Sequence, residues 1–181
     1  MLTSIAKCWM RFWRAKDGLA AIEFAFIAPV MATMFLGVVE LCDGLTARQK
    51  VTSVASTAAD LVAQQSKVTD AKKSDIFSAL NAILYPYATT GAKIRITSII
   101  DNGSGGGKVA WSDAQNTSPY SVGSAISVPS GLIVSGGSVI LAEITYSYTS
   151  STAKMFTTGV TMTDKFYSRP RKVSQISRTS S

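Results

Sequence analysis

The chain has 181 residues, of which 18 are Lys or Arg, 11 are Asp or Glu and none is His, so its formal net charge is +7. The absence of His excludes Ser-His-Asp and Cys-His nucleophile pairs and any zinc site that contains His. Two cysteines, Cys8 and Cys42, are too few for a disulfide scaffold or a cysteine metal cluster. The apolar share of 46% argues against disorder, and the length predicts one domain.

An apolar run follows a basic N-terminal segment. Residues 1–18 carry four basic side chains and one acidic side chain, and residues 24–39 carry no charge. As a helix, residues 19–41 would extend about 34 Å, which covers a hydrocarbon core of about 30 Å. Basic flanks stay in the cytoplasm. We therefore predict a cytoplasmic leader over residues 1–18, a transmembrane helix over 19–41, and an extracytoplasmic domain over 42–181.

Two other processing routes fit the residues less well. A secretory signal has an apolar region of about 7–15 residues and small residues at its cleavage site, and neither the run nor Leu45-Thr46-Ala47 matches this pattern. A lipoprotein would need small residues before Cys42, where Glu40 and Leu41 stand. Cys42 is expected to be a plain interfacial residue. A disulfide to a second subunit stays open, because the outer side is oxidising.

Glu23 is a carboxylate near the start of the apolar run. An unpaired carboxylate in a membrane costs several kcal/mol, so we expect either a partner or hydration at the headgroup level. Residues 18–24, Gly-Leu-Ala-Ala-Ile-Glu-Phe, resemble the cleavage motif of type IVb prepilins of the Flp (tight-adherence) class. The resemblance implies cleavage by a prepilin peptidase between Gly18 and Leu19. It also implies that Glu23, followed by Phe24, pairs with the new N-terminal ammonium group in a neighbouring subunit.

The helical pattern continues beyond the membrane segment. Apolar side chains recur at helical spacing past Gly44, which predicts an outward extension of the helix, at Val51, Val54, Ala55, Ala58, Leu61 and Val62. Pro29 is expected to kink the membrane helix, and Gly44 is expected to bend it at the membrane exit. The small side chains of the extension suit packing against the chain's own sheet, and packing against another helix is the alternative.

Local signals predict a second helix and a hairpin. Ser74-Asp75-Ile76-Phe77 predicts an N-cap and an acidic first turn, and Pro86 is expected to end this helix. Alternation from Lys93 to Ile100 predicts a strand, and the glycine-rich residues 102–107 predict a turn into a return strand. The glycine cluster is not a phosphate loop, because Val109 follows Gly107-Lys108 where a phosphate loop has Ser or Thr.

The rest of the chain predicts a loop, two strands and a tail. Residues 114–142 carry no charge, and most of them are predicted to form a long loop. A strand is predicted over 138–149, with Glu143 facing water or a partner and an apolar face towards the helices, at Ile140, Ala142, Ile144, Tyr146 and Tyr148. A short strand over 165–168 is expected before a basic tail. The tail is a candidate site for acidic lipid or polysaccharide, with a solvated terminus as the alternative, at Arg169, Arg171 and Lys172.

The whole chain is similar to the TadE/TadG-like pilus assembly proteins. Several short motifs carry this similarity: Glu23-Phe24-Ala25 with Pro29, residues 58–62, 96–99, 111–112, 142–148 and 167–171. The chain lacks the length and the acidic cluster of TadG-type members, so it resembles the TadE-like ones. The resemblance implies an α+β, pilin-like fold, in which an N-terminal transmembrane helix extends into a long amphipathic helix packed on a small antiparallel sheet.

The same resemblance implies a minor pilin or pseudopilin that takes part in assembly of Flp pili. The implied partners are the prepilin peptidase, other pilins and pseudopilins, the Tad secretion machinery and the inner membrane. Nucleic acid, metals and cofactors are not expected. The expected location is the bacterial inner membrane with a periplasmic C-terminal domain, and incorporation into the pilus stays open. An uncleaved, membrane-anchored periplasmic binding module is the alternative function. An enzyme is not expected, because the acidic residues are scattered along the sequence.

Overall fold

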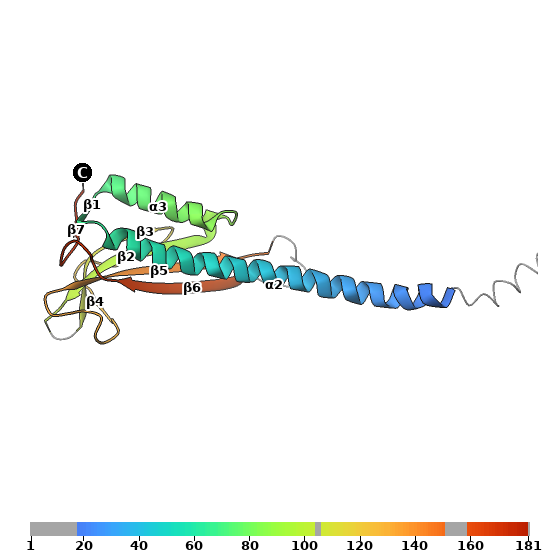
Figure 1. Ribbon diagram of the computed structural model, residues 1–181. Coiled ribbons are helices and arrows are strands. Elements are labelled where there is room, and N and C mark those ends of the chain that lie inside the picture. The colour runs from blue at the N-terminus through green and yellow to red at the C-terminus, as the bar shows by residue number, and fades with distance from the viewer. Residues whose placement is uncertain (1–17, 104–105, 151–158, 181) are drawn as a thin grey trace, which may run out of the picture. The chain divides into compact units, whose positions relative to one another are not determined.

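The computed structural model describes residues 18–103, 106–150 and 159–180 (Figure 1). The predicted leader over residues 1–18 lies outside the described residues, except for Gly18. The chain divides into two compact units, one up to Cys42 and one from Asp43 onward. The predicted α+β class is confirmed, because a long N-terminal apolar helix is followed by helix α3 and an antiparallel sheet.

Helix α2 extends over Leu19–Ala63 and contains both Pro29 and Gly44. The predicted helix and its extension past Gly44 are confirmed. The extension buries one stripe of small apolar side chains, at Ala47, Val51, Val54, Ala55, Ala58, Ala59 and Val62. These residues belong to one core cluster with strand residues of the same chain, so the extension packs on the chain's own sheet. The kink at Pro29 stays a prediction.

Helix α3 extends over Asp70–Leu84. The predicted N-cap at Ser74 is wrong, because Ser74 and Asp75 lie inside the helix. Thr69 is the N-cap, and its side chain accepts a hydrogen bond of 3.3 Å from the backbone N–H of Lys72. Thr69-Asp70 offers the same cap and acidic first turn at an earlier position, which satisfies backbone donors that Ser74 would leave open. The predicted end before Pro86 is confirmed.

Five strands form an antiparallel sheet in the order β4-β3-β2-β5-β6. Their bounds are Ala92–Asp101 for β2, Gly107–Gln115 for β3, Ala125–Ile126 for β4, Ser138–Tyr148 for β5 and Val160–Ser168 for β6. The predicted hairpin and the strand from residue 138 are confirmed. The last strand is longer than predicted, since β6 begins at Val160, and β4 lies inside the predicted long loop. Strands β1 (Lys67–Val68) and β7 (Ser177–Arg178) form a separate parallel pair.

The two faces of the sheet are covered by different parts of the chain. The face towards α2 and α3 carries Ile94 and Ile96 of β2 together with the predicted apolar set of β5, all within the main core cluster. The opposite face carries a smaller cluster of Ile99, Val139 and Leu141. Side chains of the neutral segment after β3 pack against that cluster, at Ile126, Val128 and Ile133. This segment therefore covers part of the second face of the sheet.

Candidate functional site

The membrane segment of α2 exposes its apolar side chains in every direction. The large exposed side chains are Leu19, Ile22, Phe24, Phe26, Ile27, Val30, Met31, Met34, Phe35, Leu36, Val38, Val39 and Leu41. By length and composition, α2 is the helix among the described residues that could cross a membrane. A helix has its backbone hydrogen bonds satisfied internally, which a hydrocarbon environment requires. The segment fits a single-pass membrane anchor.

The predicted cleavage residues lie at the start of this anchor. Gly18 directly precedes α2, and Leu19 is its first residue, with 61% of its surface exposed. Among the described residues, no atom lies within 4 Å of the place that a Cβ on Gly18 would take, and the glycine has no positive φ. The local fold therefore does not require glycine at this position. The bond after Gly18 joins an exposed glycine to an exposed helix start.

Glu23 and Phe24 follow on the first turns of α2. Both are exposed, and Phe24 leaves 68% of its surface open. Within the described residues, Glu23 has no ion pair. Glu23 is the fifth residue of α2 and lies beyond its first turn. The structure thus places this acid where a neighbouring group could reach it. Farther along the helix, the Thr33 hydroxyl donates a hydrogen bond of 2.8 Å to the Pro29 carbonyl.

Two of the three basic residues of the predicted tail site, Arg169 and Arg171, contact different parts of the chain. Arg169 donates hydrogen bonds to the backbone carbonyls of Gly131 and Leu132. Arg171 forms an ion pair with Asp60 of α2 and borders a groove of about 390 Å³ between α2 and β6. Lys172 is exposed and has no ion pair with any described residue. The guanidinium groups of Arg169 and Arg171 thus both have partners within the chain.

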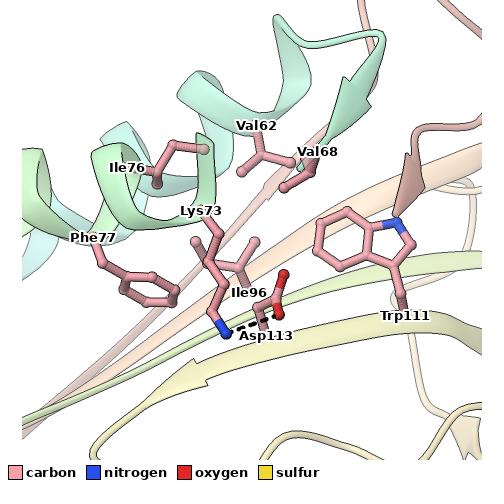
Figure 2. Close-up of a pocket in the computed structure, with 8 residues that line it drawn as sticks. All are labelled: Val62, Val68, Lys73, Ile76, Phe77, Ile96, Trp111 and Asp113. Carbon is pink, nitrogen blue, oxygen red and sulfur yellow. Dashed lines mark ion pairs between the residues drawn. The ribbon is translucent and has the colours of Figure 1, made fainter. Parts of the chain in front are cut away.

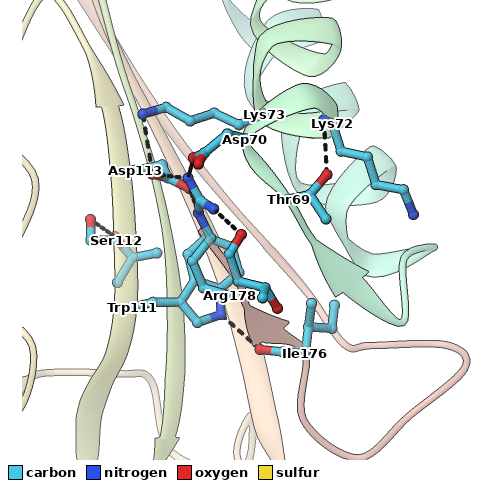
Figure 3. A network of polar contacts seen from close by, with 11 residues as sticks. Thr69, Asp70, Lys72, Lys73, Trp111, Ser112, Asp113, Ile176 and Arg178 are labelled. Atoms are coloured by element: carbon cyan, nitrogen blue, oxygen red, sulfur yellow. Dashed lines mark hydrogen bonds and ion pairs between the residues drawn. The ribbon is translucent and has the colours of Figure 1, made fainter. Parts of the chain in front are cut away.

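A different arginine, Arg178 of β7, organises the C-terminal segment (Figure 3). Its guanidinium group pairs with Asp70 at the start of α3 and with Asp113 of β3. Lys73 of α3 forms a second ion pair with Asp113, at 3.3 Å. The hydrogen bonds to the two carboxylates, Asp113 first, raise the pKa of Arg178. These contacts connect β7, α3 and β3 through side chains far apart in the sequence.

The same segment closes over Trp111. The indole Nε1 of Trp111 donates a hydrogen bond of 2.7 Å to the backbone carbonyl of Ile176, and both side chains are buried in the main core. Figure 2 shows the hollow beside Trp111, lined by apolar side chains of α2, α3 and β2 and by the Lys73–Asp113 pair. Its volume is about 10 Å³, which is room for about one water molecule. The hollow is therefore packing space and not a substrate site.

A carboxylate and two tyrosines meet at the start of the second unit. Asp43 accepts hydrogen bonds of 2.7 Å from the Tyr87 hydroxyl and of 2.6 Å from the Tyr148 hydroxyl. Burial, together with the hydrogen bond to Asp43, raises the pKa of Tyr87 to about 12. The Tyr87 ring contacts the rings of Tyr146 and Tyr148 edge to face, at centroid distances of 6.4 and 6.0 Å. An open cleft of about 410 Å³ lies beside this group.

A second charged cluster lies on the sheet face opposite the helices. Glu143 of β5 pairs with Lys165 at 2.7 Å and with Arg95 at 3.3 Å. The Arg95 guanidinium also lies 4.1 Å from the centre of the Tyr120 ring. Burial opposes ionisation of Glu143, but the hydrogen bonds from Lys165 and Tyr120 and the charges of Lys165 and Arg95 lower its pKa overall. Glu143 thus lies on the face away from the helices, as expected, but 12% of its side chain is exposed and its partners are residues of the same chain.

Sequence reasoning missed all three of these clusters. Their members are 48 to 105 positions apart in the pairs Arg95–Glu143, Trp111–Ile176 and Asp43–Tyr148. No spacing within one element signals such a pair. The basic residues of the C-terminal segment are visible in the sequence, but no local pattern connects Arg171 and Arg178 to the acids with which they pair, at positions 60, 70 and 113.

Residues 18–60 match the sequence profile of the family described as TadE-like protein. No curated protein and no solved structure matches the chain. The matched range begins at Gly18, contains Glu23 and Phe24, and ends within α2 at Asp60. The chain therefore carries a TadE-like segment over residues 18–60, consistent with a TadE-like pilus assembly protein.

Proposed function

We propose that the protein is a minor pilin or pseudopilin that takes part in assembly of Flp type IVb pili. In this proposal a prepilin peptidase cuts after Gly18, and the helix from Leu19 anchors the mature chain in the inner membrane. The observation that carries the proposal is the coincidence of two boundaries. The TadE-like match begins at residue 18, and the apolar helix begins at residue 19.

The environment of Gly18 supports processing at this bond. The fold has open space around Gly18, so a glycine here serves no packing purpose within the described chain. A peptidase that needs close access to the backbone would explain why glycine stands at this position. Cleavage would place a new ammonium group on Leu19, four residues before Glu23. In the low-dielectric environment of a membrane, pairing with such a group would offset much of the cost of placing the Glu23 carboxylate there.

The basic leader supports the orientation. Four basic residues precede the apolar run, and positive flanks remain in the cytoplasm. The domain from Asp43 would then lie in the periplasm. Its partners would be the prepilin peptidase, other pilins and pseudopilins, and the Tad secretion machinery.

The N-terminus of the membrane-purified protein tests the processing step. Intact-mass measurement and N-terminal sequencing should find a chain that starts at Leu19 in cells with the peptidase. Gly18→Leu should block cleavage without disturbing the fold, because the site has room for a side chain. A chain that starts at Met1 in peptidase-positive cells contradicts processing. That result would favour an uncleaved binding module, for which the cleft of about 410 Å³ beside Asp43 is the candidate site.

Assembly requires a separate measurement. Glu23→Ala should insert into the membrane and be cleaved normally, but it should lower pilus yield in sheared preparations. Asp75→Ala is the matched control, because it removes one exposed carboxylate from α3, away from the anchor. Normal piliation of the Glu23 variant would contradict the pairing function of Glu23.

A further inference from the structure

Strand β6 forms one edge of the five-stranded sheet. It has nine residues, whereas the strand at the opposite edge, β4, has two. A long edge strand offers a row of backbone N–H and C=O groups to any other strand. In the proposed pilin function, on which this step rests, the protein would work among many similar subunits, and such an edge would invite uncontrolled strand addition. Side chains of the same chain form hydrogen bonds with backbone groups of β6.

Two hydrogen bonds identify the backbone groups of β6 that point away from β5. The Arg48 guanidinium donates to the carbonyl of Thr163 at 3.3 Å. The backbone N–H of Lys165 donates to Oδ1 of Asp164 at 2.8 Å. In an antiparallel strand, the N–H and C=O of one residue point to the same side, and alternate residues share that side. Thr161, Thr163, Lys165 and Tyr167 therefore present the outward groups.

The central outward groups of β6 already form hydrogen bonds with side chains of the same chain. Arg48 takes the Thr163 carbonyl, and Asp164 takes the Lys165 N–H. The other oxygen of Asp164 accepts a hydrogen bond from the Thr52 hydroxyl. Arg48 and Thr52 are one helical turn apart on α2, which runs alongside β6 in Figure 1. Side chains of a neighbouring helix thus reach the central positions of the edge.

We propose that Arg48, Thr52 and Asp164 form an edge guard that prevents another strand from adding to β6. An added strand would need the Thr163 carbonyl and the Lys165 N–H, and both would first have to leave their present partners. The guard also places a charge of each sign at the edge, which disfavours the approach of an uncharged strand. Contacts between this domain and other subunits would consequently use side-chain surfaces and not β6 pairing.

The test compares the full-length protein with a double variant in detergent micelles. Arg48→Ala/Asp164→Ala removes both occupants of the edge and leaves the apolar positions of β6 unchanged. We expect its protein mass by light scattering to rise with concentration, towards about twice the wild-type value. We also expect slower hydrogen exchange at the amides of Thr161, Thr163 and Tyr167 as concentration increases. The wild type should show neither change.

Asp164→Asn is the matched control, because its side-chain oxygen can still accept from the Lys165 N–H. It should behave as the wild type does. Should the double variant lose its folded circular dichroism signal, Arg48→Ala/Thr52→Ala changes two exposed helix residues and frees the Thr163 carbonyl while Asp164 keeps the Lys165 N–H, so its mass should rise with concentration by less. The proposal is overturned if the folded variants match the wild type in mass and exchange. Concentration-dependent protection of the same amides in the wild type would overturn it too.

Discussion

The carboxylate of Asp43 accepts a hydrogen bond of 2.6 Å from the hydroxyl of Tyr148, which lies 105 positions later in the chain. Asp43 is the first residue of the second unit, and Tyr148 is the last residue of β5. The contact therefore fixes the start of the outer part of α2 to the end of a central strand. Tyr87, from the segment after α3, donates to the same carboxylate. One acidic group thus holds three separate parts of the domain together.

The raised pKa of Tyr87 predicts a late step in a tyrosine titration. Its ordinary pKa of 10.0 rises to about 12 in the folded protein. Because the folded state holds this proton more tightly, its contribution to the free energy of unfolding is complete below pH 10.0 and is lost as pH rises towards 12. Phenolate absorbance should show a step near pH 12 that belongs to Tyr87. Tyr87→Phe should remove that step, and its persistence in the variant would contradict the assignment.

Glu143 predicts a loss of stability in acid. Its pKa is lowered from 4.5 by Lys165, Tyr120 and Arg95 against the opposing effect of burial. The folded state therefore binds this proton less tightly, and the stabilisation is present above pH 4.5 and is lost as pH falls through the lowered value. Thermal unfolding of the wild type and Glu143→Gln should converge as pH falls. Equal differences at neutral and acid pH would contradict this expectation.

The sequence predicted the elements whose signals are local. The apolar run from Leu19 and the alternation in β2 and β5 gave the helix and the strands, because burial on one face imposes a period on the chain. The N-cap of α3 was misplaced, since Thr69 and Ser74 offer similar capping chemistry and the choice depends on the tertiary structure. The covering of the second sheet face was missed, because a neutral Ser- and Gly-rich segment shows no period.

In the candidate site, too, local sequence patterns could be interpreted and contacts between distant residues could not. Gly18, Leu19, Glu23 and Phe24 could be proposed from the sequence because they lie within seven consecutive residues, and their functions stay predictions. The partners of Arg171 and Arg178 could not be predicted, because they lie 65 to 111 positions away, at Asp60 for Arg171 and at Asp70 and Asp113 for Arg178. The number of basic residues can be counted from the sequence. Whether these residues form ion pairs within the folded chain cannot be read from that number.

Arg178 predicts a strong contribution of the C-terminal segment to stability. Arg178→Ala would leave the largely buried Asp113 with Lys73 alone, and Asp70 would lose its guanidinium partner. Hydrogen bonds to charged groups contribute about 1.5–3 kcal/mol, so we expect the free energy of unfolding to fall by about 2–3 kcal/mol. Chemical denaturation of the full chain in detergent measures this change.

Lys172→Ala is the control for the Arg178 variant. It removes one positive charge from the same segment, and the residue is exposed with no ion pair to a described residue. Exposed substitutions of this kind usually change stability by less than about 0.5 kcal/mol. Equal destabilisation by both variants would indicate that net charge matters and that the specific pairing of Arg178 does not.

Adjacent residues of β2 provide the last prediction. The Ser98 hydroxyl is buried and has no hydrogen-bond partner among the described residues, whereas the Thr97 hydroxyl is 2.9 Å from that of Ser112. An unsatisfied buried polar group costs about 1–3 kcal/mol, so Ser98→Ala should leave stability unchanged or raise it. Thr97→Val keeps the side-chain shape but removes a satisfied bond, and should lower stability by about 1 kcal/mol. Thermal unfolding of the two variants and the wild type measures these changes in stability. A Ser98→Ala variant less stable than Thr97→Val would show that the Ser98 hydroxyl has a partner.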